Sequence, residues 1–159
     1  MPEDRLDRFM LRIPLDFPNR DAERQMLLQT TGATTAHAPT LMNATTLLAA
    51  QKLVRRLPVG DKIVDAILAL TRSLRPEDSS ASSDVRDAVS FGPGPRAAQA
   101  LMIATRARAL LNGRLAPSLD DVVALAEPVL SHRIRLGFGA RASGVTVEAL
   151  IRKQAQTIL

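Results

Sequence analysis

The sequence of 159 residues contains no cysteine, no tryptophan and no tyrosine, and only two histidines and four phenylalanines. Without cysteine there is no disulfide, no thiolate metal ligand and no thiol nucleophile. The two histidines, His37 and His132, are far apart and lack ligand-like neighbours, so no metal site is expected. The scarcity of aromatic rings argues against a stacking platform for single-stranded nucleic acid.

Long apolar runs are also missing. No run approaches the roughly 18–20 residues that span a membrane, and the N-terminal stretch MPEDRLDRF is too charged for a signal peptide. We therefore expect a cytoplasmic protein with no membrane contact. The net charge of +5 leaves a phosphate-tracking helix open as an alternative, although nucleic-acid binding is not favoured. The densest set of basic residues without acidic neighbours is Arg96, Arg106, Arg108 and Arg114.

The motifs of self-sufficient enzymes are missing as well. The sequence has no glycine-rich loop ending in GK[ST], no evident Ser-His-Asp set and no paired carboxylates in an apolar setting. A self-sufficient NTPase is therefore excluded. Arginine is left as the residue type that could act on a bound substrate.

What is present is a mainly α-helical pattern, with 46% hydrophobic residues to build a core. A short helix at the N-terminus is followed by an alternating strand up to Phe17, and a second brief strand is expected at 87–91. Because an isolated strand is unstable, the first 17 residues are interpreted as the end of a sheet-containing domain. Six further helices are predicted at 18–29, 41–57, 60–74, 95–111, 118–136 and from 146 onward, the fifth kinked or divided at Pro128. The expected loops are 30–40, 76–87 and 137–144, and the expected N-caps include Thr40, Ser118 and Thr146.

The helix at 95–111 is apolar around most of its circumference, which predicts a central position. Gly94 is tolerated at its N-cap, Pro95 suits the first helical position, and Arg96 falls in the first turn. The guanidinium and the positive helix end could converge on one phosphate. The alternative is a solvated Arg96, or a weak surface pair with Asp87 or Glu127.

Arg8 follows Asp4 by four residues, which is the spacing of a common surface ion pair on a helix. By itself this spacing predicts only that pair, which is of small value.

Three segments resemble, in this order, the C-terminal part of MoxR-type AAA+ ATPases: PEDRLDRFMLRIPLDFPNRDAER, GPGPRAAQALMIATRARALLNGR and SLDDVVALAEPVLSHRI. The resemblance implies that residues 1–17 are a helix and strand left from the α/β ATPase core. Residues 18–159 would form the helical lid domain, a bundle of about five to six helices. Arg8, in LDRF, resembles the arginine finger that reaches the γ-phosphate bound by a neighbouring ring subunit. Arg96, in GPGPR, resembles the sensor 2 arginine, and Gly94 and Arg96 would lie at the nucleotide.

Pro93 and Gly94 stand where the family more usually has Ala and Ser, so the side-chain cap of that helix is lost. The family's Walker A, Walker B and sensor 1 segments would precede Met1. This chain alone is therefore expected to bind no cofactor and to be inactive, whereas ATP and Mg²⁺ are implied for the parent enzyme. The implied partners are the other subunits of an AAA+ ring and a von Willebrand factor A domain protein, in a chaperone-like assembly role. The alternative is a free-standing helical interaction or regulatory module without ATPase activity.

Overall fold

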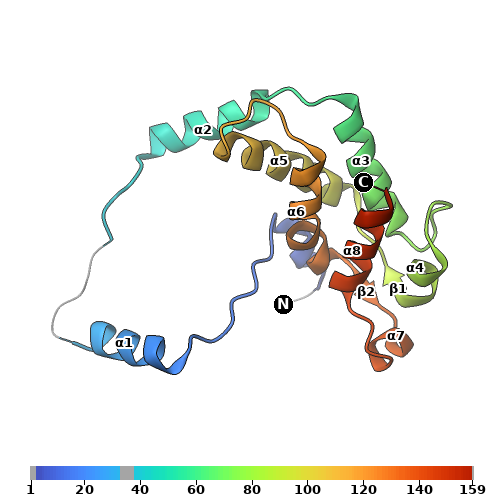
Figure 1. The fold of residues 1–159 in the computed structure, drawn as a ribbon, viewed down its shortest axis with the longest axis horizontal. Coiled ribbons are helices and arrows are strands. Elements are labelled where there is room, and N and C mark those ends of the chain that lie inside the picture. The colour runs from blue at the N-terminus through green and yellow to red at the C-terminus, as the bar shows by residue number, and fades with distance from the viewer. Residues whose placement is uncertain (1–2, 33–37, 159) are drawn as a thin grey trace. The chain divides into compact units, whose positions relative to one another are not determined.

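A computed structural model describes residues 3–32 and 38–158, and for residues 3–5 only the backbone (Figure 1). The described residues up to Arg12 and from Lys52 onward form one compact unit, and Ile13–Gln51 form a second. The described part is mainly α-helical, as predicted. Its elements are the 3-10 helix η1 (Glu3–Arg8), α1 (Arg20–Thr30), α2 (Ala44–Arg56), α3 (Asp61–Ser73), α4 (Ser83–Ala88), β1 (Val89–Phe91), α5 (Pro95–Leu111), α6 (Leu119–Leu130), the 3-10 helix η2 (Ser131–Arg133), β2 (Arg135–Leu136), α7 (Phe138–Ala142) and α8 (Val147–Ile158).

All six predicted longer helices are present, and α5 has the predicted bounds. The expected loops at 76–87 and 137–144 are wrong in part, because they contain the short helices α4 and α7. The helix predicted at 118–136 does not run over the whole range. It ends at Leu130 as α6, and Pro128 lies inside α6 and does not end it. Part of the loop expected at 30–40 lies outside the described residues.

The predicted N-caps are confirmed at two of three helices. Ser118 opens α6 in the predicted capping box, and the Thr146 hydroxyl accepts a hydrogen bond from Ala149 N at 3.2 Å at the start of α8. Thr40 is not the cap of α2. The Asn43 side chain accepts from Thr46 N at 2.8 Å instead, because the helix begins three residues later than predicted.

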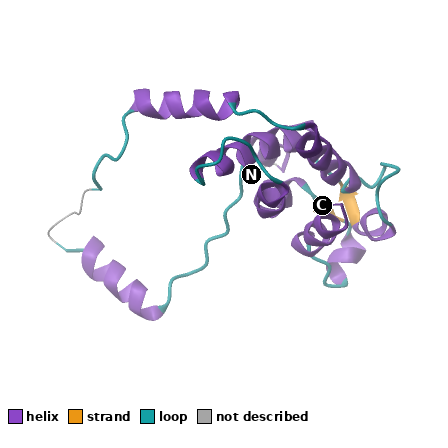
Figure 2. Ribbon diagram, turned by 45° about the horizontal axis from the view of Figure 1, so that its top comes forward, coloured by secondary structure: helices purple, strands orange, loops and turns teal. Residues whose placement is uncertain are grey.

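The strand predicted before Phe17 is not formed. Residues 11–19 have no regular secondary structure, and Ile13, Leu15 and Phe17 are exposed. Pro14 lacks the N–H that a ladder needs, and the described part of the chain offers these residues no neighbouring strand. The alternation of apolar and polar residues therefore predicted a strand that does not form. The strand predicted at 87–91 is confirmed as β1, which pairs antiparallel with β2, a strand that was not predicted (Figure 2).

The core of the larger unit lies between α3, α5, α6 and α8; α3 and α6 contact each other and each contacts both α5 and α8. The buried face of α5 consists mostly of small residues, among them Ala97, Ala100 and Ala104, which let α3 and α6 approach its backbone closely. This arrangement explains why α5 is so rich in alanine. The largest fully buried side chains of this core are Ile67, Leu70, Leu74, Leu101, Leu130 and Ile151.

A buried carboxylate joins the end of α5 to the start of α6. Asp121 is fully buried and accepts from Arg114 at 2.6 and 2.7 Å, from Arg108 at 2.5 Å and from Ser118 N at 2.9 Å. Its pKa is lowered strongly, first by the hydrogen bonds from Arg114. Two arginines of the basic set, Arg108 and Arg114, are thus paired with one carboxylate, and Arg106 donates to Arg55 O at 3.4 Å. This set is therefore not a row of free cations.

The smaller unit, Ile13–Gln51, contains α1 and the first part of α2. Asn19 caps α1 by accepting from Ala22 N at 2.9 Å, and neither helix has a buried residue. No helix in the described ranges is long and apolar enough to cross a membrane.

Candidate functional site

Gly94 is the N-cap of α5, and its backbone is extended. Because glycine has no side chain, no side chain caps the start of this helix. Pro95 occupies the first helical position, and the first turn contains no acidic residue. The positive end of the helix dipole is therefore not compensated by a side chain of its own first turn. This is the electrostatic setting predicted for an anion at Gly94 and Arg96.

The loop before α5 is held by its backbone instead of by a cap. A Cβ built on Gly92 would lie 2.7 Å from both Arg75 Cα and Leu74 O, so only glycine fits against the end of α3. Arg75 Nε donates to Pro93 O at 2.8 Å from the same side. The loop is thus fixed by close packing, which the sequence pattern did not indicate.

Replacing Gly92 by alanine is expected to lower the free energy of unfolding by about 1–3 kcal/mol, because the added methyl group overlaps main-chain atoms that cannot move away alone. Gly94→Ala is the matched control in the same loop, since nothing lies within 4 Å of its added Cβ. Urea unfolding of the two variants measures the difference. Equal stability of both variants would contradict the packing argument.

Arg96 is exposed over 61% of its side chain, and its Nη1 lies 3.6 Å from Asp7 Oδ2. The ion pair expected with Asp87 or Glu127 is therefore wrong, and Glu127 lies 3.4 Å from Arg152 instead. The partner differs because η1 contacts α5, an arrangement that sequence spacing does not reveal. A guanidinium so exposed can turn towards another anion at small cost.

Arg8, the other predicted site residue, is exposed at the end of η1. The side chain of Asp4, its predicted surface partner, lies outside the described side chains. The preceding residue, Asp7, is the one that pairs with Arg96. The structure thus links the LDRF segment to the start of α5 through Asp7.

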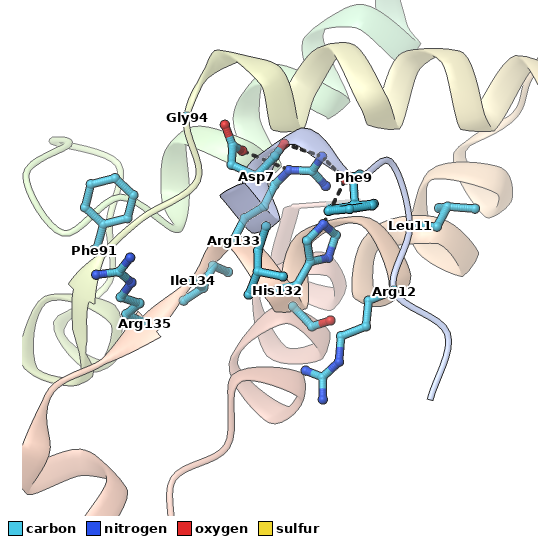
Figure 3. A pocket seen from close by; sticks show the side chains of 12 residues that line it. Asp7, Phe9, Leu11, Arg12, Phe91, Gly94, His132, Arg133, Ile134 and Arg135 are labelled. Atoms are coloured by element: carbon cyan, nitrogen blue, oxygen red, sulfur yellow. Dashed lines mark hydrogen bonds and ion pairs between the residues drawn. The ribbon is translucent and has the colours of Figure 1, made fainter. Parts of the chain in front are cut away.

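A cavity of about 1020 Å³ adjoins this contact (Figure 3). It is lined by residues of η1 and the turn after it, by Phe91 and Gly94, and by the residues from Ser131 to Arg135. Three arginines and one aspartate are among them, and the guanidinium of Arg135 lies 5.7 Å from the centre of the Phe91 ring. The lining is therefore both apolar and positively charged.

Two residues in this wall, His132 and Arg133, were not predicted as site residues. His132 Nε2 lies 3.0 Å from Phe9 O, and burial lowers the pKa of its imidazole. Because a carbonyl only accepts, the neutral ring donates its Nε2 proton to Phe9 O. Arg133 is buried and bonds to the same segment. Sequence patterns carried no signal for these contacts, which join residues more than 120 positions apart.

The positively charged groups at this site can contact an anion from one side. Among the described side chains, no group of three or more His, Asp and Glu could hold a metal ion; His37 lies outside the described residues. The exposed guanidinium of Arg96 and the uncapped start of α5 fit a phosphate group. They do not by themselves enclose a nucleotide.

Comparisons with known proteins find one similar family and two similar curated proteins. The profile of the AAA lid domain family matches residues 81–154. Chaperone MoxR1 of Mycobacterium tuberculosis (strain ATCC 25618 / H37Rv) is 29% identical over 158 residues, which is 99% of this chain and 42% of the relative. The uncharacterized protein YeaC of Bacillus subtilis (strain 168) is 29% identical over 154 residues, 96% of this chain and 45% of the relative.

A solved structure shares the fold. The crystal structure of a "putative ATPase" from Cytophaga hutchinsonii matches all of this chain and 48% of its own length, with a TM-score of 0.87 and 21% identity. The chain spans less than half the length of the relatives that it matches. It is therefore similar to the C-terminal part of MoxR-type AAA+ ATPases, and residues 81–154 resemble the AAA lid domain.

Proposed function

We propose that this chain supplies the lid and the arginine-finger segment of an AAA+ ATPase whose parent enzyme binds ATP with Mg²⁺ and hydrolyses it. Arg8 is the finger that reaches the γ-phosphate bound by a neighbouring subunit, and Arg96 is the sensor 2 arginine. The observation that carries the proposal is the position of Arg96. It lies in the first turn of a helix without a side-chain cap, next to the residue that precedes Arg8.

The role of Arg96 follows from charge and position. Phosphoryl transfer places negative charge on the equatorial oxygens of the transferred group, and fixed positive groups stabilise that charge. In this chain the guanidinium of Arg96 and the start of α5 supply positive charge at one place. The Asp7 carboxylate that faces Arg96 is also bonded to Arg133, so its own charge is partly compensated.

Arg8 suits action across a subunit boundary because it is exposed in η1. An arginine that acts on a neighbour's nucleotide must extend from the surface of its own subunit. Its neighbour Asp7 and the following residues are anchored to the lid by hydrogen bonds. The proposed finger segment therefore belongs to the same structural unit as the described residues from Lys52 onward.

Replacing Arg96 by alanine tests the proposal. In the ATPase that contains this chain, the variant is expected to lose most ATP turnover, at least about 10²-fold, while ATP still binds. Steady-state phosphate release and equilibrium binding of a fluorescent ATP analogue measure the two quantities. Arg141→Ala is the control, since Arg141 is an exposed arginine on α7 and does not line the cavity. Turnover like that of the unaltered enzyme would refute the role of Arg96.

The proposed partners are the neighbouring subunits of an AAA+ ring and, by family analogy, a von Willebrand factor A domain protein. The similarity to Chaperone MoxR1 supports a chaperone-like role. We propose, by family analogy, that this role is the assembly of other complexes in the cytoplasm. The alternative is a free-standing interaction module. It predicts that ATP turnover in cells does not change when Arg8 or Arg96 is replaced.

A further inference from the structure

The guanidinium of Arg133 is almost fully buried and has all five of its N–H groups engaged. Nε donates to Asp7 Oδ1 at 3.1 Å, and Nη2 donates to Asp7 O at 3.1 Å and to Phe9 O at 2.6 Å. Nη1 donates to Met10 O at 3.3 Å and to Val129 O. Four of the five acceptors thus belong to residues 7–10, the segment that contains Arg8, and Figure 3 shows Arg133 against Asp7 and Phe9 of this segment.

These contacts hold the backbone on both sides of Arg8. Residues 11–19 have no regular secondary structure, so no sheet fixes the chain beyond the segment. Besides Arg133, the described residues join this segment to η2 and α6 through the bond from His132 to Phe9 O and the bond from Arg12 N to Pro128 O at 2.9 Å. Arg133 makes four bonds to this segment, and bonds from a charged donor are stronger than neutral ones.

Asp7 connects this anchor to the other candidate site residue. One oxygen of its carboxylate bonds to buried Arg133, and the other lies 3.6 Å from exposed Arg96. The contact with Arg133 dominates, because the pair with Arg96 is longer and largely in water. The position of the Asp7 carboxylate is therefore set by Arg133.

We propose that Arg133 is a positioning residue for the arginine finger: its guanidinium holds residues 7–10 against the lid so that Arg8 is presented at a fixed place. The effect of Arg133 on catalysis rests on the proposed function of Arg8. The anchoring itself does not depend on that function. Lysine cannot replace Arg133, because an ammonium has three donors and lacks the planar fork that reaches the Asp7 carboxylate and several carbonyls together.

The first test follows the backbone amide of Arg12 by NMR hydrogen exchange in the chain of 159 residues. This amide donates to Pro128 O and reports whether the segment is docked. Arg133→Gln is expected to raise its exchange rate at least about tenfold, since one lost hydrogen bond to a charged group has that effect. Arg133→Lys is expected to raise it nearly as much. Arg141→Gln, an exposed arginine on α7, should leave it unchanged.

Unchanged exchange at Arg12 in Arg133→Gln, with the amide of buried Leu101 as protected as before, would overturn the anchoring. Full rescue by Arg133→Lys would overturn the requirement for the fork. If Arg133→Gln fails to fold, Asp7→Ala decides instead, because it removes the Nε contact from the partly exposed side. Faster exchange at Arg12 in Asp7→Ala would then support the anchor, and unchanged exchange would overturn it.

The second test uses the ATPase that contains this chain. Arg133→Gln is expected to lower kcat for ATP hydrolysis at least about tenfold with KM unchanged. In an Arg8→Ala background it should have no further effect, because the residue that it positions is gone. An equal loss in both backgrounds would overturn the positioning role. A fully active Arg8→Ala enzyme would refute the proposed function instead, while the exchange result would still decide the anchor.

Discussion

Replacing Arg8, the proposed arginine finger, by alanine is expected to lower ATP turnover by about 10³-fold or more in the proposed parent ATPase, with ATP binding nearly unchanged. An arginine finger acts on charge that develops in the transition state, so its loss reduces kcat far more than ground-state affinity. Arg8 is exposed and follows the anchored Asp7 directly, which fits contact with a neighbour. Steady-state phosphate release and equilibrium ATP binding separate the two effects.

Arg20→Ala is the control for this experiment, since it removes another exposed arginine, at the start of α1. Full activity of Arg8→Ala would refute the finger assignment. Mixed assemblies of Arg8→Ala and Arg96→Ala subunits then show how the two residues divide their work. Recovery of turnover on mixing means that one subunit supplies Arg8 and another supplies Arg96 to the same nucleotide. Persistent inactivity means that one subunit supplies both.

Replacing Asp121 by alanine is expected to lower the free energy of unfolding of the larger unit by about 3 kcal/mol. The substitution removes the partner of Arg108 and Arg114 and the capping-box bond to Ser118 N. The value lies at the lower end for a broken buried pair, because both arginines are more than a third exposed and water can solvate them. Denaturant unfolding measures the change.

Asp120→Ala is the matched control, because Asp120 is the exposed neighbour in the same first turn. It should cost no more than about 1 kcal/mol through the helix dipole. An equal effect of the two substitutions would show that the buried ion pairs contribute nothing beyond that dipole term.

The same carboxylate makes stability depend on pH. The hydrogen bonds from Arg114 lower the pKa of Asp121 well below its ordinary value of 3.8. A carboxyl whose pKa is lower in the folded state contributes its full stability above the unfolded pKa and loses it as the pH falls further. Unfolding followed from pH 5 to pH 2 should therefore show a steeper loss for the unaltered chain than for Asp121→Asn. Parallel curves would rule out this linkage.

Local signals in the sequence were sufficient for several elements. Gly94-Pro95 and Asn112-Gly113 bracket α5, and its predicted bounds are those observed. Ser118 and Asp121 lie three residues apart, so the capping box of α6 could be predicted from spacing alone. These features depend on neighbours along the chain, which is why they did not require a tertiary structure.

The strand expected before Phe17 failed for the opposite reason. Alternation describes which side of a strand would be buried, but a strand forms only where another strand supplies its hydrogen bonds. Helices α4 and α7 were missed because they are short and lie in Ser-rich and Gly-rich segments. Short helices are stabilised by packing more than by their own propensity.

For the candidate site, the sequence by itself determined which residues stand at the motif positions, Arg8, Gly94 and Arg96, through the resemblance of their segments to a known family. Only the tertiary structure decided what holds them. Arg133 reaches Asp7 across 126 positions of the chain, and Gly92 is required by the backbone of Leu74 and Arg75, which follow α3. The partners of a buried polar group are set by whichever segments pack against it, and no local pattern records that choice.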